Sequence, residues 1–257
     1  MPILLLIRHA TNDFVKTGRL PGQSPNIHLN AEGQAQAEAL GRFLTQHKLS
    51  AVYSSHLERA IETAWRIAAP QGLGITVRPD LADTHAGDFT GKTVKELAES
   101  PETKDAWTVI VEKPSEGKLP NGESLLDMQR RIVAALDQIC AAHPDPQPDQ
   151  RTTGSGNAGA GNAGAAPEHE GQGNPAATSL PSPPTPPVVA VVMHADPIKA
   201  ALAHYLGMPF DNFQRLATAP ASIQAVMVAT HAKPPMNVSV MSVNATVPVV
   251  REQDARR

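Results

Sequence analysis

The chain has 257 residues and 41% hydrophobic content, enough for one sizeable α/β core or two small domains. Its formal net charge of −3 provides no strong basic field, which argues against nucleic acid and anionic membranes as partners. The single cysteine, Cys140, excludes an internal disulfide framework, and we interpret it as a small buried helix residue in a reducing compartment.

The first eighty residues predict a βαβαβ arrangement. Ile3–Ile7 is a short, continuous apolar run typical of a buried strand, and Asn30 is a candidate N-cap for a helix that continues to about Lys48. The next three predicted elements are a strand at Ser50–Ser54, a helix at His56–Ala69 and a strand at Gly74–Arg78. This alternation predicts a parallel sheet with right-handed crossovers.

The middle of the chain is less regular and predicts a short cap. The cap spans Leu81–Pro120 and contains one short helix near Val94–Glu99. A long amphipathic helix follows at Gly122–Ala142, and its apolar stripe predicts core packing. Residues 144–187 then change to Gly, Ala, Asn and Pro without periodic apolar positions. Such a segment buries too little surface to offset its chain entropy, so we predict a disordered insertion.

Order returns at Val188–Met193, which has the pattern of a buried strand. The remaining predicted elements are a helix at Ile198–Leu206 and strands at Ser222–Thr230 and Val238–Val243. Because Val188–Met193 needs sheet partners from the first half, we predict one domain over residues 1–257, with 144–187 as an insertion. The predicted fold is a three-layer α/β/α sandwich with a mostly parallel central sheet, a short cap and the loop insertion.

No apolar run approaches the roughly 18 to 20 residues needed to span a bilayer. The run Ile3–Ile7 is too short for a signal peptide and lacks a basic flank. We therefore expect a soluble cytoplasmic protein without a membrane partner.

Two predicted strands end in a histidine, His9 after Arg8 and His194 after Met193. Ligands of open α/β sheets bind beyond the carboxyl ends of the strands, so both histidines are expected in one crevice. Arg59 lies in the first turn of the helix after the second strand and can add a bidentate donor. The alternatives are ordinary loop histidines and an exposed arginine paired with Glu62. Taken together, these residues predict a cationic pocket for a phosphoryl group.

Seven motifs, in register along most of the ordered chain, resemble the histidine phosphatase superfamily, also called the phosphoglycerate mutase-like family. The segments that carry the resemblance are LLLIRHATND, GRLPG (Gly18–Gly22), LNAEGQAQA (Leu29–Ala37), SSHLERAIETA (Ser54–Ala64), LADTHAGDFTG (Leu81–Gly91), PNGES (Pro120–Ser124) and MHADPI (Met193–Ile198).

The resemblance implies a role for each matching residue. His9 would be the nucleophile that forms a phosphohistidine, and Asp83 would be the general acid and then the base. Arg8, Arg59 and His194 would hold the phosphate oxygens. Further substrate contacts are expected from Asn12, Arg19 and Ala195. No metal or other cofactor is implied, because the cationic side chains neutralise the charge.

The sequence departs from the family pattern at four positions. Ala10 stands where glycine is usual, which would place a methyl group near the phosphate. Asp83 replaces the commoner glutamate and reaches one methylene less far. Val15 occupies the position of a usual asparagine, so Asn12 is the candidate to supply that amide. Ala195 follows the distal histidine in place of glycine.

Several alternatives stay open from the sequence. Asp196 is a second candidate for the general acid; the alternative is that it caps the helix N-terminus before Pro197. His85 is interpreted as an exposed loop residue. A phosphomonoesterase of small phosphorylated metabolites is favoured over a mutase because the cap is short. A catalytically silent phosphate-binding regulator is the third possibility. Cap residues around Asp88–Trp107 and Lys113–Leu119 are expected to set the substrate, and the protein is expected to be a monomer or homodimer.

Overall fold

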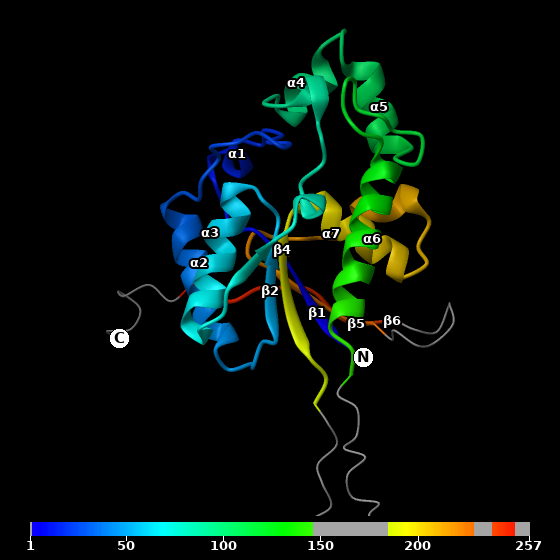
Figure 1. Cartoon of the computed structure of the whole chain (residues 1–257). Coiled ribbons are helices and arrows are strands. Elements are labelled where there is room, and N and C mark those ends of the chain that lie inside the picture. The colour runs from blue at the N-terminus through cyan, green and yellow to red at the C-terminus, as the bar shows by residue number, and fades with distance from the viewer. Residues whose placement is uncertain (1, 146–184, 229–237, 250–257) are drawn as a thin grey trace, which may run out of the picture.

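The computed structural model describes residues 2–145, 185–228 and 238–249. Its strands form one six-stranded sheet in the order β3-β2-β4-β1-β5-β6 (Figure 1). The pairings among β1, β2, β3 and β4 are parallel, whereas β5 is antiparallel to both β1 and β6. The predicted α/β fold with a mostly parallel sheet is therefore confirmed. The strands are β1 (Ile3–Arg8), β2 (Ala51–Ser54), β3 (Ile75–Val77), β4 (Val188–Met193), β5 (Ile223–Val228) and β6 (Val238–Ala245).

Helices cover both faces of the sheet, and two more stand above one end of it (Figure 1). The α-helices are α1 (Asp13–Lys16), α2 (Ala31–Leu44), α3 (Glu58–Ala68), α4 (Val94–Glu99), α5 (Lys104–Glu112), α6 (Leu125–Ala142) and α7 (Ala195–Tyr205). Short 3-10 turns are η1 (Ala69–Gln71), η2 (Pro79–Leu81), η3 (Gly87–Phe89) and η5 (Phe210–Arg215). Helix α5 was not predicted; it is short, and Ile110 is its one buried residue.

The apolar character of β1 follows from its central position. Leu4 and Leu6 pack into a core shared with α6 and α7, whereas Leu5 and Ile7 pack into a core shared with α2 and α3. A strand covered on both faces cannot alternate polar and apolar residues, so it reads as a continuous apolar run. Strand β1 is thus a rigid base that ends at the edge of the sheet below α4 and α5 (Figure 1).

Strand β4 lies between β1 and β2, as the need of Val188–Met193 for sheet partners predicted. Its register with β1 pairs Ile3 with Val188 and Arg8 with Met193. The segments on either side of the predicted insertion therefore build one sheet. Nearly all of that insertion, residues 146–184, lies outside the described residues, and so do the polar tail and part of the predicted strand Ser222–Thr230.

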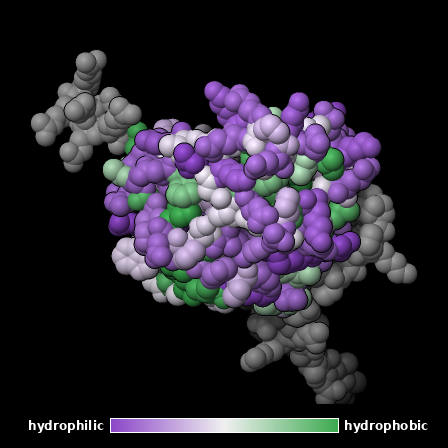
Figure 2. Space-filling model, turned by 90° about the horizontal axis from the view of Figure 1, so that it is seen from above, coloured by the Kyte–Doolittle hydropathy of each residue, from purple (hydrophilic) through white to green (hydrophobic). Residues whose placement is uncertain are grey.

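The interpretation of Cys140 as a buried helix residue is confirmed. It lies on α6 with 2% of its surface exposed, and burial raises the pKa of its thiol to about 12. Such a thiol carries almost no thiolate at neutral pH and is a poor nucleophile. The surface seen from the cap side is mostly hydrophilic, with hydrophobic residues in small separate patches (Figure 2). Within the described ranges, no helix is both long and apolar enough to cross a membrane.

Candidate active site

The ends of β1 and β4 bring the two predicted histidines together. Because Arg8 pairs with Met193 in the sheet, the next residues, His9 and His194, are neighbours. Their ring centroids are 5.1 Å apart, with 2% and 0% of the residue surface exposed, respectively. The two strand ends therefore place both histidines side by side, as expected.

The hydrogen bond of His9 assigns its tautomer. Nδ1 lies 2.8 Å from the carbonyl oxygen of Ala10, which can only accept, so Nδ1 carries the proton and donates it. The other ring nitrogen, Nε2, then keeps its lone pair. Burial lowers the pKa of His9 well below its ordinary value, and the charges of Arg59 and Arg8 lower it further. His9 is therefore a neutral imidazole with one nucleophilic nitrogen.

His194 is held by Ser55, which follows β2 at the same edge of the sheet. The Nε2 of His194 lies 2.9 Å from Ser55 Oγ, and the same oxygen accepts from the backbone N–H of Leu57 at 3.3 Å. Within the described residues, His194 Nε2 is the hydrogen-bond acceptor within reach of the Ser55 hydroxyl proton, so we assign Ser55 as the donor and place the ring proton of His194 on Nδ1. Burial is the main cause of a strongly lowered pKa for His194, so this ring is also neutral and acts as a hydrogen-bond donor.

Arg59 lies at the centre of the cluster. It is 0% exposed, and its Nη2 donates to the carbonyl oxygen of Gly22 at 2.8 Å and to Asp83 Oδ2 at 3.1 Å. The same carboxylate oxygen lies 3.6 Å from His194 Nδ1. Arg8, at the end of β1, anchors its guanidinium through Nη1 to the carbonyl oxygen of Thr218 at 2.6 Å.

Several buried donors of this cluster have no hydrogen-bond partner within the described part of the chain. A buried donor left without a partner costs free energy, so a group of them at one place indicates a ligand that accepts hydrogen bonds. An anion with several oxygens, such as a phosphoryl group, fits this arrangement. The donors are Arg8 Nε, Asn12 Nδ2, Arg59 Nε, Arg59 Nη1 and His194 Nδ1.

Asp83 is the carboxylate held against this cluster. Desolvation by burial raises its pKa, opposed by the nearby Arg59 charge and assisted by the negative charge of Asp196. Its position is fixed by the Thr84 N–H, which donates to Oδ1 at 2.9 Å, and by Gln23 Nε2, which donates to the Asp83 carbonyl oxygen at 2.8 Å. Arg131 on α6 donates to the carbonyl oxygens of Asp80, Ala82 and Asp83 and thereby holds the whole loop.

The remaining predicted site residues take different positions. Asn12 is fully buried, and its Oδ1 caps α1 by accepting from the Val15 N–H, so its amide nitrogen is the group left for a ligand. Ala195 is the first residue of α7, where a helix N-terminus favours an anion. Arg19 is exposed and donates to the carbonyl oxygen of Gly91, away from the buried donors. Its contact with substrate stays a prediction.

Asp196 and His85 were the other open residues. Asp196 accepts from Lys199 Nζ at 3.4 Å and from Gln214 Nε2 at 3.3 Å. His85 is exposed, as predicted, and its backbone N–H donates to Glu123. Ala10 was expected to place a methyl group near the phosphate. Its side chain instead packs into the core with α2 and α3, and its N–H donates to Thr63 Oγ1.

Three supporting residues were missed from the sequence. Ser55 had a usable signal, because it directly follows a strand at the edge where His9 and His194 also lie. Gln23 and Arg131 had none, because each reaches the Asp83 loop from a segment far away in the chain. Only the folded chain brings their donors to that loop.

Comparisons with a family model and with curated proteins point to one family. The model of the histidine phosphatase superfamily (branch 1) matches residues 4–147 and 174–236. Phosphoserine phosphatase 1 of Hydrogenobacter thermophilus is 31% identical over 141 residues, covering 54% of this chain and 65% of that protein. The metal-independent phosphoserine phosphatase of Arabidopsis thaliana is 33% identical over 146 residues, covering 54% of this chain and 59% of that protein. The matched part is thus less than two thirds of these relatives.

Solved structures share the fold at lower sequence identity. Bacillus stearothermophilus YhfR has a TM-score of 0.70 and 21% identity, with 97% of this chain and 99% of that chain covered. At this identity the likeness supports the fold alone, and the chemistry has to be argued from the site.

Proposed function

The chain belongs to the histidine phosphatase superfamily, and from that premise we propose that it is a metal-independent phosphomonoesterase. It would act on a small phosphorylated metabolite through a phosphohistidine intermediate. Curated relatives named as phosphatases support this activity. The observation that carries the proposal is the His9 tautomer, which directs a nucleophilic Nε2 into a cluster of buried donors that lack partners.

In the first step, the lone pair of His9 Nε2 forms a bond to phosphorus while the bond to the ester oxygen breaks. Asp83, whose raised pKa favours its protonated form, gives its proton to the departing oxygen. Arg8, Arg59 and His194 donate to the non-bridging oxygens and stabilise the charge that is spread over them. The products of this step are the free alcohol, a phosphohistidine at His9 and an Asp83 carboxylate.

In the second step, the Asp83 carboxylate takes a proton from water as the water oxygen bonds to phosphorus. The nitrogen–phosphorus bond breaks, which returns neutral His9 and protonated Asp83 and releases phosphate. Asn12 Nδ2 and the Ala195 N–H are further proposed donors to the phosphoryl group. No step requires a metal ion.

We expect p-nitrophenyl phosphate to be hydrolysed at an unchanged rate after exhaustive treatment with EDTA. Acid-free quenching followed by mass spectrometry should find one phosphoryl group, on the peptide that contains His9. Loss of activity with EDTA and recovery with Mg²⁺ would contradict the metal-independent mechanism. Activity only with a phosphorylated sugar acid and a bisphosphate primer would indicate a mutase, and the absence of any phosphoenzyme would indicate a phosphate-binding regulator.

Asp83→Asn is expected to lower kcat by ~10²- to 10⁴-fold for an alkyl phosphate, the range of a general acid–base residue. The loss should be much smaller for p-nitrophenyl phosphate, whose leaving oxygen is a weak base and needs little protonation. In the wild type, kcat/KM for the alkyl ester should fall as pH rises through the raised pKa of Asp83, because the acid must be protonated. On the acid side of the profile, kcat/KM should fall only below the pH range in which histidines usually titrate, because His9 has a lowered pKa.

The matched control is Asp196→Asn, which alters the competing carboxylate at the start of α7. It should keep the contrast between leaving groups, and the fall of kcat/KM at high pH should remain but move to lower pH, because the Asp196 charge helps to raise the pKa of Asp83. If Asp196→Asn removes the leaving-group contrast and the fall of kcat/KM at high pH, while Asp83→Asn keeps the two effects, the general acid is Asp196.

A further inference from the structure

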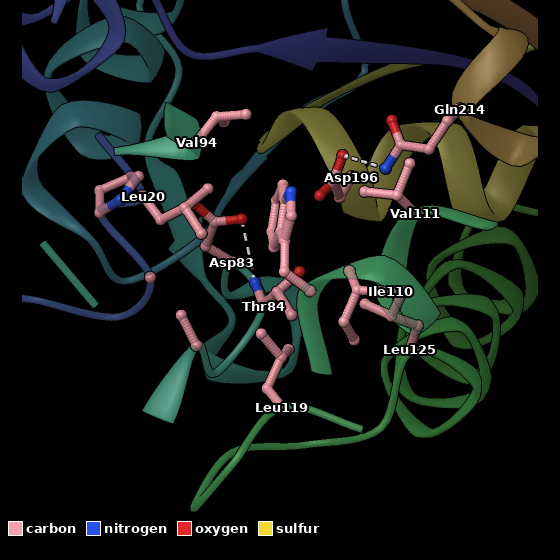
Figure 3. A pocket seen from close by; sticks show the side chains of 14 residues that line it. Leu20, Asp83, Thr84, Val94, Ile110, Val111, Leu119, Leu125, Asp196 and Gln214 are labelled. Atoms are coloured by element: carbon pink, nitrogen blue, oxygen red, sulfur yellow. Dashed lines mark hydrogen bonds between the residues drawn. The ribbon is translucent and has the colours of Figure 1, made fainter. Parts of the chain in front are cut away.

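A cavity of about 390 Å³ lies under the cap, directly beside Asp83 (Figure 3). Gly22 and Asp83, which both accept from Arg59, belong to its wall, so the cavity adjoins the buried donor cluster. A phosphate ester bound to that cluster would place its alcohol part in this cavity. The volume is in the range of small-molecule sites. The wall is formed by Leu20, Pro21, Gly22, Asp83, Thr84, Ala86, Val94, Trp107, Ile110, Val111, Leu119, Leu125, Asp196 and Gln214.

Apolar side chains dominate the wall. Those from α4, α5 and the loops around them surround the cavity (Figure 3). Val94 and Val111 are 49% and 52% exposed, large fractions for aliphatic residues on short cap helices. Trp107, on α5 with Val111, adds an aromatic surface to the wall. An apolar or aromatic ligand group would remove this surface from water, which is favourable in proportion to the area covered.

The wall of the cavity offers no cation to pair with a second anionic group of the substrate. None of the 14 residues that line the cavity is Lys, Arg or His, and two of them are aspartates, Asp83 and Asp196. Lys199 is engaged by Asp196 and Gln214, so it offsets the Asp196 charge. A carboxylate on the substrate would therefore meet Asp83 and an apolar surface, without a cation of the wall to pair with it.

We propose that the preferred substrate is a phosphate monoester of an apolar, ring-sized alcohol or phenol that carries no second anionic group. The inference rests on the proposed phosphatase function. It distinguishes this chain from relatives named for phosphoserine, an ester that carries a carboxylate. Val94, Trp107 and Leu119 of the wall come from the segments Asp88–Trp107 and Lys113–Leu119 that are expected to set the substrate, and the cavity adds Ile110 and Val111 to them.

The first test compares 2-phenylethyl phosphate with phosphoserine, both esters of primary alcohols, by release of inorganic phosphate from the full chain. Covering about 100 Å² of apolar surface corresponds to roughly a 100-fold gain, so kcat/KM should be ~100-fold higher for the phenylethyl ester. An equal or higher kcat/KM for phosphoserine would overturn the inference and leave the phosphatase function intact. If neither ester is hydrolysed and no phosphohistidine forms, the proposed function fails, and the inference fails with it.

The second test places a cation in the cavity wall with Val111→Lys. The matched control is Val109→Lys, on the same helix at a position that is 39% exposed and outside the wall. Val111→Lys should lower the ratio of kcat/KM for the phenylethyl ester to kcat/KM for phosphoserine by ~10-fold, a typical effect of one charge pair, whereas Val109→Lys should leave it unchanged. An equal shift in both variants, or none in Val111→Lys, would overturn the assignment of this cavity to the alcohol group. Both variants should still form the phosphohistidine with p-nitrophenyl phosphate.

Discussion

His9→Ala is expected to lower kcat for p-nitrophenyl phosphate by ~10⁴- to 10⁶-fold, the scale seen when a covalent nucleophile is removed. The reason is the assigned tautomer, because it leaves the lone pair on Nε2 of His9, the proposed nucleophile, while Nδ1 donates to the Ala10 carbonyl oxygen. The measurement is steady-state phosphate release together with mass spectrometry of the quenched enzyme. The phosphoryl adduct should disappear from the variant.

Binding of inorganic phosphate provides the control for folding of this variant. Arg8, Arg59 and His194 remain in His9→Ala, so phosphate should still raise its melting temperature, as expected for a ligand that binds only the folded state. His28→Ala serves as the matched histidine control, because that ring is exposed and pairs with Glu62 at the surface. It should keep full activity. Retained turnover and a phosphoenzyme in His9→Ala would show that another residue is the nucleophile.

Arg59→Ala is expected to lower kcat/KM by ~10³-fold, since removing even one preorganised donor to a transition-state oxyanion costs ~10²- to 10³-fold. Arg59 supplies two buried donors without partners, Nε and Nη1. The phosphate-induced rise in melting temperature should also disappear, which separates loss of anion binding from loss of chemistry alone. Arg59→Lys keeps the charge but not the planar, two-pronged geometry, so it should recover only part of the activity.

Arg66→Ala is the matched control for this experiment. Arg66 lies on the same helix, with its side chain 38% exposed and close to Glu38 at the surface. It should leave both kcat/KM and the phosphate response unchanged. If Arg59→Ala retains the full phosphate-induced shift, Arg59 does not bind the phosphoryl group and the proposed clamp is wrong.

The core of the site was predictable because it lies at strand ends. A run such as Ile3–Ile7 has to be apolar when helices cover both faces of a sheet, and the residues after such a strand meet the crevice at its carboxyl edge. His9 and His194 were therefore placed together from the sequence pattern alone, although 184 residues separate them in number. The ring-to-ring distance of 5.1 Å agrees with that prediction.

Reasoning from strand ends does not identify residues that contact the site from other elements. Arg131 holds the Asp83 loop from α6, and Gln23 does so from the loop before α2. Arg19 carries a motif match, yet its guanidinium contacts Gly91 on the outside of the cap. Such contacts depend on side-chain direction and on the packing of segments that are distant in the chain, and neither leaves a periodic signal in the sequence.

The amino-acid sequence was enough to predict the sheet type, the two strand ends that carry histidines and the motif residues of the buried donor cluster. Local patterns suffice for these, because burial on two faces and helix capping act on neighbouring residues. The tautomers of His9 and His194, the donors left without partners and the apolar wall under the cap became visible in the folded chain. Hydrogen-bond partners, burial and cavity shape arise from groups that meet only when the chain has folded.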